Sequence, residues 1–537
     1  MQVSIVVAYA TALARRAGRA GGAGDDKAVG PKNALALAVP VGAPASTGAG
    51  SAPPTDNAVP TDNDHEISGT ILPTAWPVPE PLLQECQALL RDVGHRGGAG
   101  TIHSLPRPMR NPATVLLVGV GSGNEQGWRQ AGAAVARTAA DRVPTLTATL
   151  PAGPEGSAAS AAAAFALGAW LALYRYRLGA QPSPARKLGR ITLAVQADDV
   201  EACRAAVART KSIVDAVAFA RDLTNTPSAV KSPKWFADRV TGAAGRRAGL
   251  TVKTLDEAEL AAAGFGGVLA VGSGSPRPPR LVEISWRPRG ARTHVVLVGK
   301  GICFDSGGIS IKPRDAMKLM RKDMGGAAAV CATVLAAADL GLPVRVTALA
   351  PLAENMVSGS SMRPGDVIRH YGGATTEVLD TDAEGRLVLG DALAYAARRL
   401  KPDYLIDLAT LTGASHVALG KRTAALFSSA PELVEALRAA GEEAGEPVWR
   451  LPLHDDYLGL LRSDVADLAN IGQPPQAGAV VAALYLREFT GDCADAWAHI
   501  DMSAPSWSDR NDGPLVKGAT GWGVRLLVQF LSSLPSR

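Results

Sequence analysis

Short apolar runs and amphipathic segments alternate along the first third of the chain. The apolar runs are rich in Val, Leu and Ala and are bounded by Gly, Pro or charged residues, which is typical of buried strands. We expect strands within residues 3–14, 33–41, 113–120 and 191–195. We expect helices at residues 81–93, 127–141 and 158–175. This alternation predicts a smaller α/β domain over residues 1–195.

Two segments of this first part need separate interpretation. Residues 42–66 are rich in Pro, Ser, Thr, Asp and Asn, a composition that predicts a disordered insertion. The run from Val3 to Ala14 is about as long as the apolar core of a signal peptide. No Lys or Arg precedes it, however, and the basic pair Arg15 and Arg16 follows it, so a strand is favoured over an export signal. No membrane span is expected, because uninterrupted apolar stretches of about 18 residues are missing elsewhere.

The same alternation continues through the rest of the chain. A helical pattern from about residue 200 to 223, within a linker over 196–225, connects the first domain to a second one. We expect strands near 281–286, 294–299, 344–350, 376–379, 403–408, 423–428 and 497–502, with helices between them. This order predicts a larger α/β domain over residues 226–537, with a mixed, mostly parallel sheet flanked by helices and charged loops at the strand ends.

Composition narrows the functional classes. Lys and Arg number 55 and Asp and Glu 50, a net charge of +5, which is mild for 537 residues. The densest basic stretch, residues 175–190, is interpreted as a solvated face, so a nucleic-acid partner is not expected. The five cysteines are scattered and no two form a Cys-x-x-Cys pair. This usage predicts reduced thiols in a cytoplasmic protein.

Charged residues are concentrated in an octet, Asp380 to Leu387, that separates a strand-like run from a helical pattern. Asp382 and Glu384 are two residues apart, so in a non-helical turn both side chains can point toward one centre. Carboxylates that close repel each other unless a cation lies between them, and divalent metals take oxygen ligands. The alternative is a solvated acidic turn at the positive end of a helix.

Two further stretches combine glycine with charge. Residues 299–313 follow an apolar strand and contain Lys300, Asp305 and Lys312, and residues 322–326 place Asp323 before an Ala-rich helix. Glycine allows the backbone to approach a bound ion or ligand closely. Both loops adjoin apolar strands and helices, which argues against a plain surface role for their charged residues.

In these stretches the chain resembles the leucyl aminopeptidase family of dinuclear metallopeptidases. The resemblance covers roughly residues 215–535 and implies a catalytic domain there, preceded by a smaller α/β domain. It rests on the ordered motifs GKGICFDSGGISIKP (299–313), KDMGG (322–326), ENM (354–356), RPGDV (363–367), DTDAEGRL (380–387), ATLTGA (409–414), ADLANIG (466–472) and WAHIDMS (497–503).

The resemblance implies two divalent metal ions as cofactors, Mn or Zn, in a peptide hydrolase that removes Leu-like N-terminal residues. It implies that Asp305 and Glu384 bridge both ions. Lys300 and Asp323 then complete one site, and Asp382 completes the other, partly through its backbone carbonyl. A lysine binds metal only as the neutral amine, so the pKa of Lys300 must be strongly lowered, and two neighbouring cations act in that direction.

Further roles follow from the same resemblance. Lys312 is expected to stay protonated and to stabilise the oxyanion of the reaction. Arg386 is expected to hold a bicarbonate ion that shuttles the proton to the leaving amine. The positions expected around the substrate side chain are Met320, Thr410, Leu411 and Gly413. The family also implies a homohexamer.

One residue departs from the family pattern, because the octet usually begins with Asn and here begins with Asp380. The extra carboxylate is expected to tighten cation binding or to change the hydrogen bonds of the loop. No histidine lies in a His-Glu-x-x-His pattern, so core or surface roles are expected for His294, His370, His416 and His499. Two alternatives stay open: a nucleic-acid-binding regulatory relative, and a catalytically silent scaffold.

Overall fold

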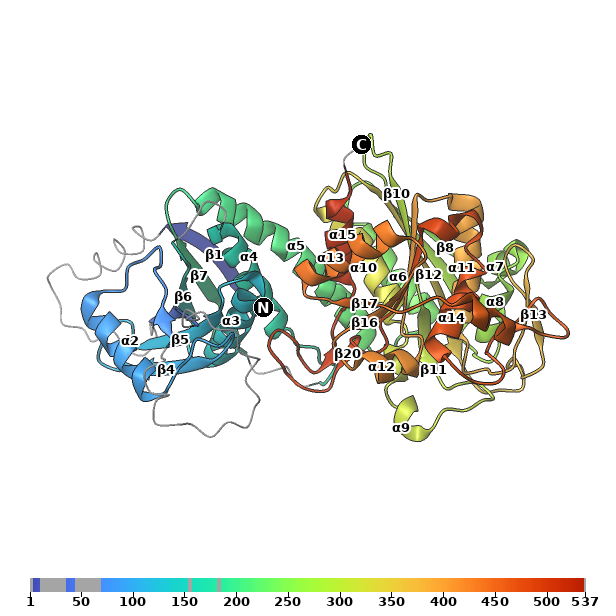
Figure 1. The fold of residues 1–537 in the computed structure, drawn as a ribbon, viewed down its shortest axis with the longest axis horizontal. Helices are drawn as coiled ribbons and strands as arrows, with labels where there is room; N and C mark the ends of the chain where they lie inside the picture. The colour runs from blue at the N-terminus through green and yellow to red at the C-terminus, as the bar shows by residue number, and fades with distance from the viewer. Residues whose placement is uncertain (1–2, 10–34, 44–68, 153–156, 181–184, 536–537) are drawn as a thin grey trace. The chain divides into compact units, whose positions relative to one another are not determined.

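The computed structural model describes residues 3–9, 35–43, 69–152, 157–180 and 185–535 (Figure 1). They divide into two compact units. The first contains the chain up to Val214 and the short segment Arg510–Val516, and the second contains Asp215–Asp509 and the chain from Lys517 onward. The division falls inside α5 (Val200–Asn225), the helix predicted within the linker. The domain limits at 195 and 225 stay predictions.

The first unit is built on one sheet, whose described strands have the order β1-β7-β6-β2-β5-β4, with β3 paired to β2. Strands β1, β7, β6, β2 and β5 run parallel, whereas β4 and β3 are antiparallel to their neighbours. The bounds are β1 (Ser4–Tyr9), β2 (Leu35–Gly42), β3 (Thr70–Ile71), β4 (Ile102–Pro106), β5 (Thr114–Gly121), β6 (Thr145–Thr149) and β7 (Arg190–Val195). The four expected strands are confirmed as β1, β2, β5 and β7. The other three lack a long apolar run and were not predicted.

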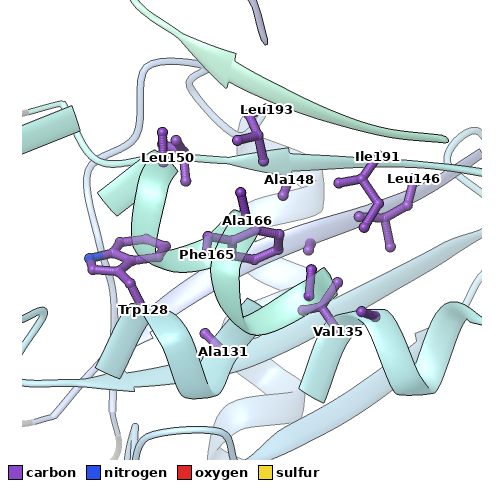
Figure 2. Close-up of a cluster of buried hydrophobic side chains, with 14 of the residues drawn as sticks. Trp128, Ala131, Val135, Leu146, Ala148, Leu150, Phe165, Ala166, Ile191 and Leu193 are labelled. Carbon is purple, nitrogen blue, oxygen red and sulfur yellow. The ribbon is translucent and has the colours of Figure 1, made fainter. Parts of the chain in front are cut away.

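Helices cover both faces of this sheet. Alternate residues of β2 point to opposite faces: Leu37 and Val39 pack with α2 (Glu80–Asp92), and Ala36 and Ala38 pack with α3 (Glu125–Ala139) and α4 (Ser157–Ala172). Figure 2 shows the second of these cores, in which Trp128 and Phe165 lie beside the strands. A Cβ atom on Gly132 would lie 2.1 Å from the carbonyl oxygen of Phe165, so glycine lets α3 and α4 pack backbone to backbone.

The second unit contains a nine-stranded sheet among the described residues, with the order β17-β16-β19-β15-β10-β12-β9-β8 and with β11 added beside β12. Its centre, from β19 to β12, is parallel, and antiparallel pairs join β16 to β19, β12 to β9 and β9 to β8. The predicted mixed, mostly parallel sheet is confirmed. The bounds are β8 (Leu250–Leu255), β9 (Arg280–Trp286), β10 (His294–Gly299), β11 (Gly301–Asp305), β12 (Arg345–Asn355), β15 (Tyr404–Ala409), β16 (Ala424–Phe427), β17 (Val448–Arg450) and β19 (Trp497–Asp501).

Two groups of helices flank this sheet. One group packs around Val296, Val298 and Leu349 and consists of α8 (Gly266–Gly272), α11 (Gly385–Tyr395) and α14 (Gly478–Arg487). The other group consists of α6 (Pro233–Ala244), α10 (Gly325–Asp339), α13 (Pro431–Ala444) and α15 (Val524–Ser533). Shorter helices are α7 (Glu257–Ala263), α9 (Arg314–Met317) and α12 (Gly413–Leu419). The α/β fold class is therefore confirmed in both units.

Of two local expectations, the strand before the acidic octet is confirmed, and the loop over residues 301–305 was wrong. The strand expected before the acidic octet is β14 (Thr375–Glu377), which pairs with β13 (Val367–Arg369) and β18 (Leu468–Ala469) in a small sheet of its own. It is short and mixed in polarity, so it does not enter the buried main sheet. Residues 301–305 were expected in a loop, but they form a strand, in which Ile302 to Asp305 pair in parallel with Ala353 to Asn355 of β12. A last small pairing joins β20 (Trp507–Ser508) and β21 (Gly518–Ala519).

Other expectations meet mixed outcomes. All five cysteines are buried and free, and the reduced state of their thiols stays a prediction. Within the described part of the chain, no helix combines the length and the apolar character that a bilayer crossing requires. Apart from residues 42 and 43, the insertion predicted at 42–66 lies outside the described residues, as do residues 10–14 of the first expected strand.

Candidate metal centre

The fold brings the five predicted metal ligands together from four segments of the second unit. Lys300 directly follows β10, and Asp305 is the last residue of β11. Asp323 lies two residues before the start of α10, and Asp382 and Glu384 belong to the turn that leads into α11. Ligand sites in α/β sheets are characteristically built where strands end and helices begin.

Three of these carboxylates form a tight cluster. One oxygen each from Asp305, Asp382 and Glu384 lies within 4.8 Å of the other two. Asp305 and Glu384 are only 1% exposed, and Asp382 is half-buried. Burial raises the pKa of Asp382 to about 6, and repulsion from Asp305 adds to this. Burial, followed by the charge of Asp305, raises the pKa of Glu384 as well. The cluster therefore favours a cation that would relieve the repulsion.

Several oxygens of the cluster lack a neutral hydrogen-bond donor. Glu384 Oε2 has neither a hydrogen bond nor an ion pair with the described residues. Glu384 Oε1, Asp323 Oδ2 and Asp382 Oδ1 face the charged amines of Lys300 and Lys312. Buried carboxylate oxygens normally have partners, so this donor set fits hard or borderline divalent ions.

Lys300 lies between two of the acids. Its Nζ is 2.8 Å from both Asp323 and Glu384 and donates to the carbonyl oxygen of Thr410 at 3.1 Å. Burial lowers the pKa of Lys300, but the charges of Asp323 and Glu384 raise it further than burial lowers it. Cations bound to those carboxylates would cancel their effect. The lowered pKa predicted for Lys300 therefore depends on the metals.

Lys312 approaches the cluster from another side. Its Nζ lies 2.8 Å from Asp305 Oδ2 and also forms an ion pair with Asp382. Burial lowers the pKa of this amine, whereas Asp305 and Glu384 raise it, and the net shift is upward. Lys312 is therefore held as a cation directly beside two of the predicted metal ligands.

Arg386 lies in the first turn of α11, buried to 8% exposure. One guanidinium nitrogen donates to the carbonyl oxygen of Asn470 at 2.6 Å, and the group lies 6.0 Å from the centre of the Tyr485 ring. The Nε atom makes no hydrogen bond to the described residues. Burial lowers the pKa of Arg386, and Tyr485 and Glu384 oppose that shift. A buried guanidinium with spare donors fits a small oxyanion.

A cavity of about 260 Å³ lies against Lys300, Glu384 and Arg386. Its lining comes from Lys300, Asp380, Asp382, Ala383, Glu384, Gly385, Arg386, Leu411, Thr412, Gly413, Ala414, Ile471 and Gly478. Leu411 and Gly413 thus line this cavity. Thr410 is outside the lining and donates through its hydroxyl to Asp323 Oδ1 at 2.6 Å, and Met320 lies in the turn just before Asp323. The substrate-pocket role of all four residues stays a prediction.

Asp380 has a defined place in the turn. Its Oδ1 accepts a hydrogen bond from the backbone N–H of Asp382 at 2.8 Å, a bond that the side-chain oxygen of Asn would also make. Asp380 changes the local charge, therefore, while keeping this loop hydrogen bond.

The four histidines occupy the roles expected of them. His294, His370 and His499 are buried and hydrogen-bonded to Thr347, Asp391 and Asp407, and His416 is exposed. Among the described residues, the metal-type cluster contains carboxylates alone.

Sequence reasoning missed several polar residues that support the site. Asn355 and Asn470 are buried beside the turn that contains Asp382 and Glu384. Asp501 accepts hydrogen bonds from the backbone N–H groups of Leu411 and Thr412 at 3.1 and 3.0 Å. All three lie inside quoted motifs. Their presence there was the available signal, but Asp305, Leu379 and Leu411, which they contact, are 50, 91 and 90 residues away along the chain.

Comparison with known proteins agrees with this geometry. Residues 218–528 match the catalytic domain of the cytosol aminopeptidase family, and residues 70–178 match the N-terminal domain of the same family. A probable cytosol aminopeptidase of Rhodococcus erythropolis is 43% identical over 467 residues, 85% of this chain and 90% of the relative. One from Corynebacterium glutamicum is 50% identical over 323 residues, 60% of this chain and 64% of the relative.

A solved structure is also similar. The bottromycin maturation enzyme BotP in complex with Mn superposes with a TM-score of 0.77 at 36% identity, covering 94% of this chain and 99% of BotP.

Proposed function

Because this chain belongs to the cytosol aminopeptidase family, we propose that it hydrolyses N-terminal residues from peptides with two divalent metal ions in the described cluster. The observation that carries the proposal is the convergence of Asp305, Asp382 and Glu384, whose oxygens lie within 4.8 Å of one another. Glu384 Oε2 has no partner among the described residues, and other oxygens of the cluster face cationic lysines, so the cluster fits cations. The Mn complex of BotP supports a metal of that kind.

The ligand assignment that we propose follows the family resemblance. Asp305 and Glu384 would serve both ions, Lys300 and Asp323 would complete one site, and Asp382 would complete the other. Mn and Zn are the ions we favour. When bound, two such ions lower the pKa of a bound water and polarise the scissile carbonyl group.

The remaining charged residues act on the reacting peptide. Lys312 keeps its positive charge beside Asp305 and stabilises the negative charge that develops on the carbonyl oxygen. Arg386 holds a bicarbonate-sized anion with its spare donors and positions it for proton transfer from the attacking water to the departing amine. The Asn470 carbonyl oxygen holds the guanidinium in place.

The substrate preference we propose is for Leu-like N-terminal residues. Leu411, Gly413, Ala414 and Ile471 line the cavity and offer small or apolar contacts. Met320 and Thr410 are also proposed to contact the substrate side chain, from positions close to Asp323. A cavity of this kind binds an apolar side chain through contact area rather than through charge.

A hydrolysis assay with leucine anilide tests the proposal. Protein loaded with Mn²⁺ or Zn²⁺ should release the anilide product, dialysis against a chelator should abolish turnover, and added metal should restore it. A lysine anilide and a glutamate anilide serve as controls for side-chain preference. Full activity in rigorously metal-free protein would overturn the metal mechanism.

We also propose that the chain works in the cytoplasm as a homohexamer, by analogy with its family. Light scattering measures the assembly directly. A stable and fully active species at the single-chain mass of 55.2 kDa would contradict the hexamer.

A further inference from the structure

Two buried asparagines flank the turn that contains Asp382 and Glu384. Neither of them has a role in the reaction proposed above. Asn355 is 2% exposed and Asn470 is fully buried. Asn355 ends β12, and Asn470 directly follows β18. They come from separate sheets and contact different residues of the same turn.

Asn355 joins the turn to a predicted metal ligand. Its Nδ2 donates to Asp305 Oδ1 at 2.9 Å and to the carbonyl oxygen of Thr381 at 3.0 Å. The backbone carbonyl oxygen of Asn355 accepts hydrogen bonds from the N–H and the hydroxyl of Ser306, the residue after Asp305. One amide group therefore links the Asp305 carboxylate directly to the turn, in addition to the hydrogen bonds of Thr381 with Gly307 and Ser310.

Asn470 joins the turn to Arg386. Its Oδ1 accepts from the N–H groups of Leu379 and Asp380 at 2.8 and 3.2 Å, and its Nδ2 donates to the carbonyl oxygen of Asp380 at 2.6 Å. Its backbone carbonyl oxygen accepts from Arg386. The side chain thus holds the start of the turn while the backbone of the same residue holds the guanidinium.

The chemistry of these partners requires an amide. Asn355 faces only acceptors through Nδ2, and Asn470 faces two donors and one acceptor, so the orientation of both amides is determined by their surroundings. An aspartate at either position would place oxygen against oxygen. Partners of this kind orient the residues that bind a metal, and their loss typically lowers metal affinity or activity by about 10–100-fold.

We propose that Asn355 and Asn470 are positioning residues with separate tasks. Asn355 fixes the position of the Asp305 carboxylate relative to the turn, and Asn470 aligns the Arg386 guanidinium with the metal ligands. The inference rests on the proposed function, because it assumes that the carboxylate cluster binds divalent ions. Loss of Asn355 then acts mainly on metal binding, and loss of Asn470 acts mainly on turnover.

The test compares Asn355→Ala and Asn470→Ala with the wild-type protein, by calorimetric titration with Mn²⁺ and by steady-state hydrolysis of leucine anilide. Asn355→Ala should weaken Mn²⁺ binding by about 10–100-fold and should recover most of its kcat at saturating Mn²⁺. Asn470→Ala should keep a kcat about 10–100-fold low even at saturating Mn²⁺, with a smaller change in KM.

A double-mutant cycle isolates the link to Arg386. Arg386→Ala should lower kcat much less in the Asn470→Ala background than in wild type, because the alignment is already lost, and should keep its full effect in the Asn355→Ala background. Glu446→Gln is the structural control. Its buried carboxylate binds the N–H groups of Gly523 and Leu526, which do not line the cavity. It should lower the melting temperature and leave Mn²⁺ affinity and kcat unchanged.

Different outcomes distinguish failure of the proposed function from failure of the positioning roles. A wild-type protein that neither binds Mn²⁺ nor cleaves the anilide overturns the proposed function. A functional wild type whose two asparagine variants differ from it no more than Glu446→Gln does, or whose Asn470→Ala and Arg386→Ala effects simply multiply, overturns the positioning roles. Where an alanine variant does not fold, the serine variant at the same position retains a small hydrogen-bonding group and answers the same question.

Discussion

Gly385 lies directly against the side chain of Lys300. A Cβ atom on Gly385 would come within 2.5 Å of Lys300 Cε and 2.7 Å of its Nζ. The first residue of α11 is therefore a glycine because the amine of a predicted metal ligand occupies the space that any other side chain would need.

This contact makes Gly385→Ala a sensitive test of the amine ligand. The added methyl group should displace Lys300 and weaken metal binding, and activity should fall with metal content. Elemental analysis and anilide hydrolysis measure both quantities. Gly390→Ala is the matched control in the same helix, because the nearest atoms to its Cβ would belong to the Phe489 ring, at 3.3 Å. Equal metal content in Gly385→Ala and wild type would contradict the placement of Lys300.

Substitutions within the cluster should separate metal ligands from transition-state groups. Asp305→Ala and Glu384→Ala should lose metal and activity together, because each side chain is proposed to serve both ions. Lys312→Ala should keep most of its metal and lower kcat by about 10²–10³-fold, the usual cost of an electrostatic donor. Arg386→Ala should also keep its metal and lose about 10²–10⁴-fold, or less where buffer anions take over the proton transfer.

Metal analysis and steady-state kinetics on the four variants show which residues bind metal and which act only on the transition state. If Lys312→Ala empties the metal sites as thoroughly as Asp305→Ala does, the division of roles is wrong. High bicarbonate in the assay provides a further control, because it should stimulate wild type more than Arg386→Ala.

Asp380 offers a matched pair of substitutions. Asp380→Asn keeps a side-chain oxygen for the N–H of Asp382, whereas Asp380→Ala removes it. We therefore expect Mn²⁺ affinity to fall further in Asp380→Ala than in Asp380→Asn, with a loss of about 10–100-fold for the alanine variant. Calorimetric titration measures the order, and the reverse order would show that the charge of Asp380 matters more than its hydrogen bond.

His294 should make the fold sensitive to acid. It is buried and bonded to Thr347 at 3.0 Å, and burial, with help from Arg345 and Arg287, lowers its pKa from the usual 6.5 to about 4. Between these values the unfolded chain binds the proton and the folded chain does not, so stability falls as the pH falls from about 6.5 to 4. The contribution is roughly 2–3 kcal/mol.

Urea unfolding of chelator-treated protein at pH 7 and pH 4.5 measures this effect. His294→Gln removes the titrating group and should lose less stability than wild type between the two pH values. The carboxylates of the metal centre titrate in both proteins and cancel in the comparison. An identical pH dependence in the two proteins would show that His294 is not the group responsible.

The sequence by itself determined the α/β class and the identity of the metal-binding candidates. Strand and helix periodicity are local properties, so β10, β15, β19 and α5 were predictable from short windows. Asp382 and Glu384 were likewise predictable, because two residues in one turn are close whatever the rest of the chain does. Short or polar strands such as β4 and β6 were not, since their pairing depends on neighbours rather than on their own pattern.

Only the tertiary structure decided how the candidates work together. Asp305 and Asn355 are 50 residues apart in the chain, and Arg386 and Asn470 are 84 apart, yet each pair shares a hydrogen bond. Spacing carries no information about such contacts, because they form when separate elements pack. Burial is equally non-local: the shifted pKa values of Asp382 and Glu384 arise from desolvation and from Asp305, which packing brings to the acidic turn.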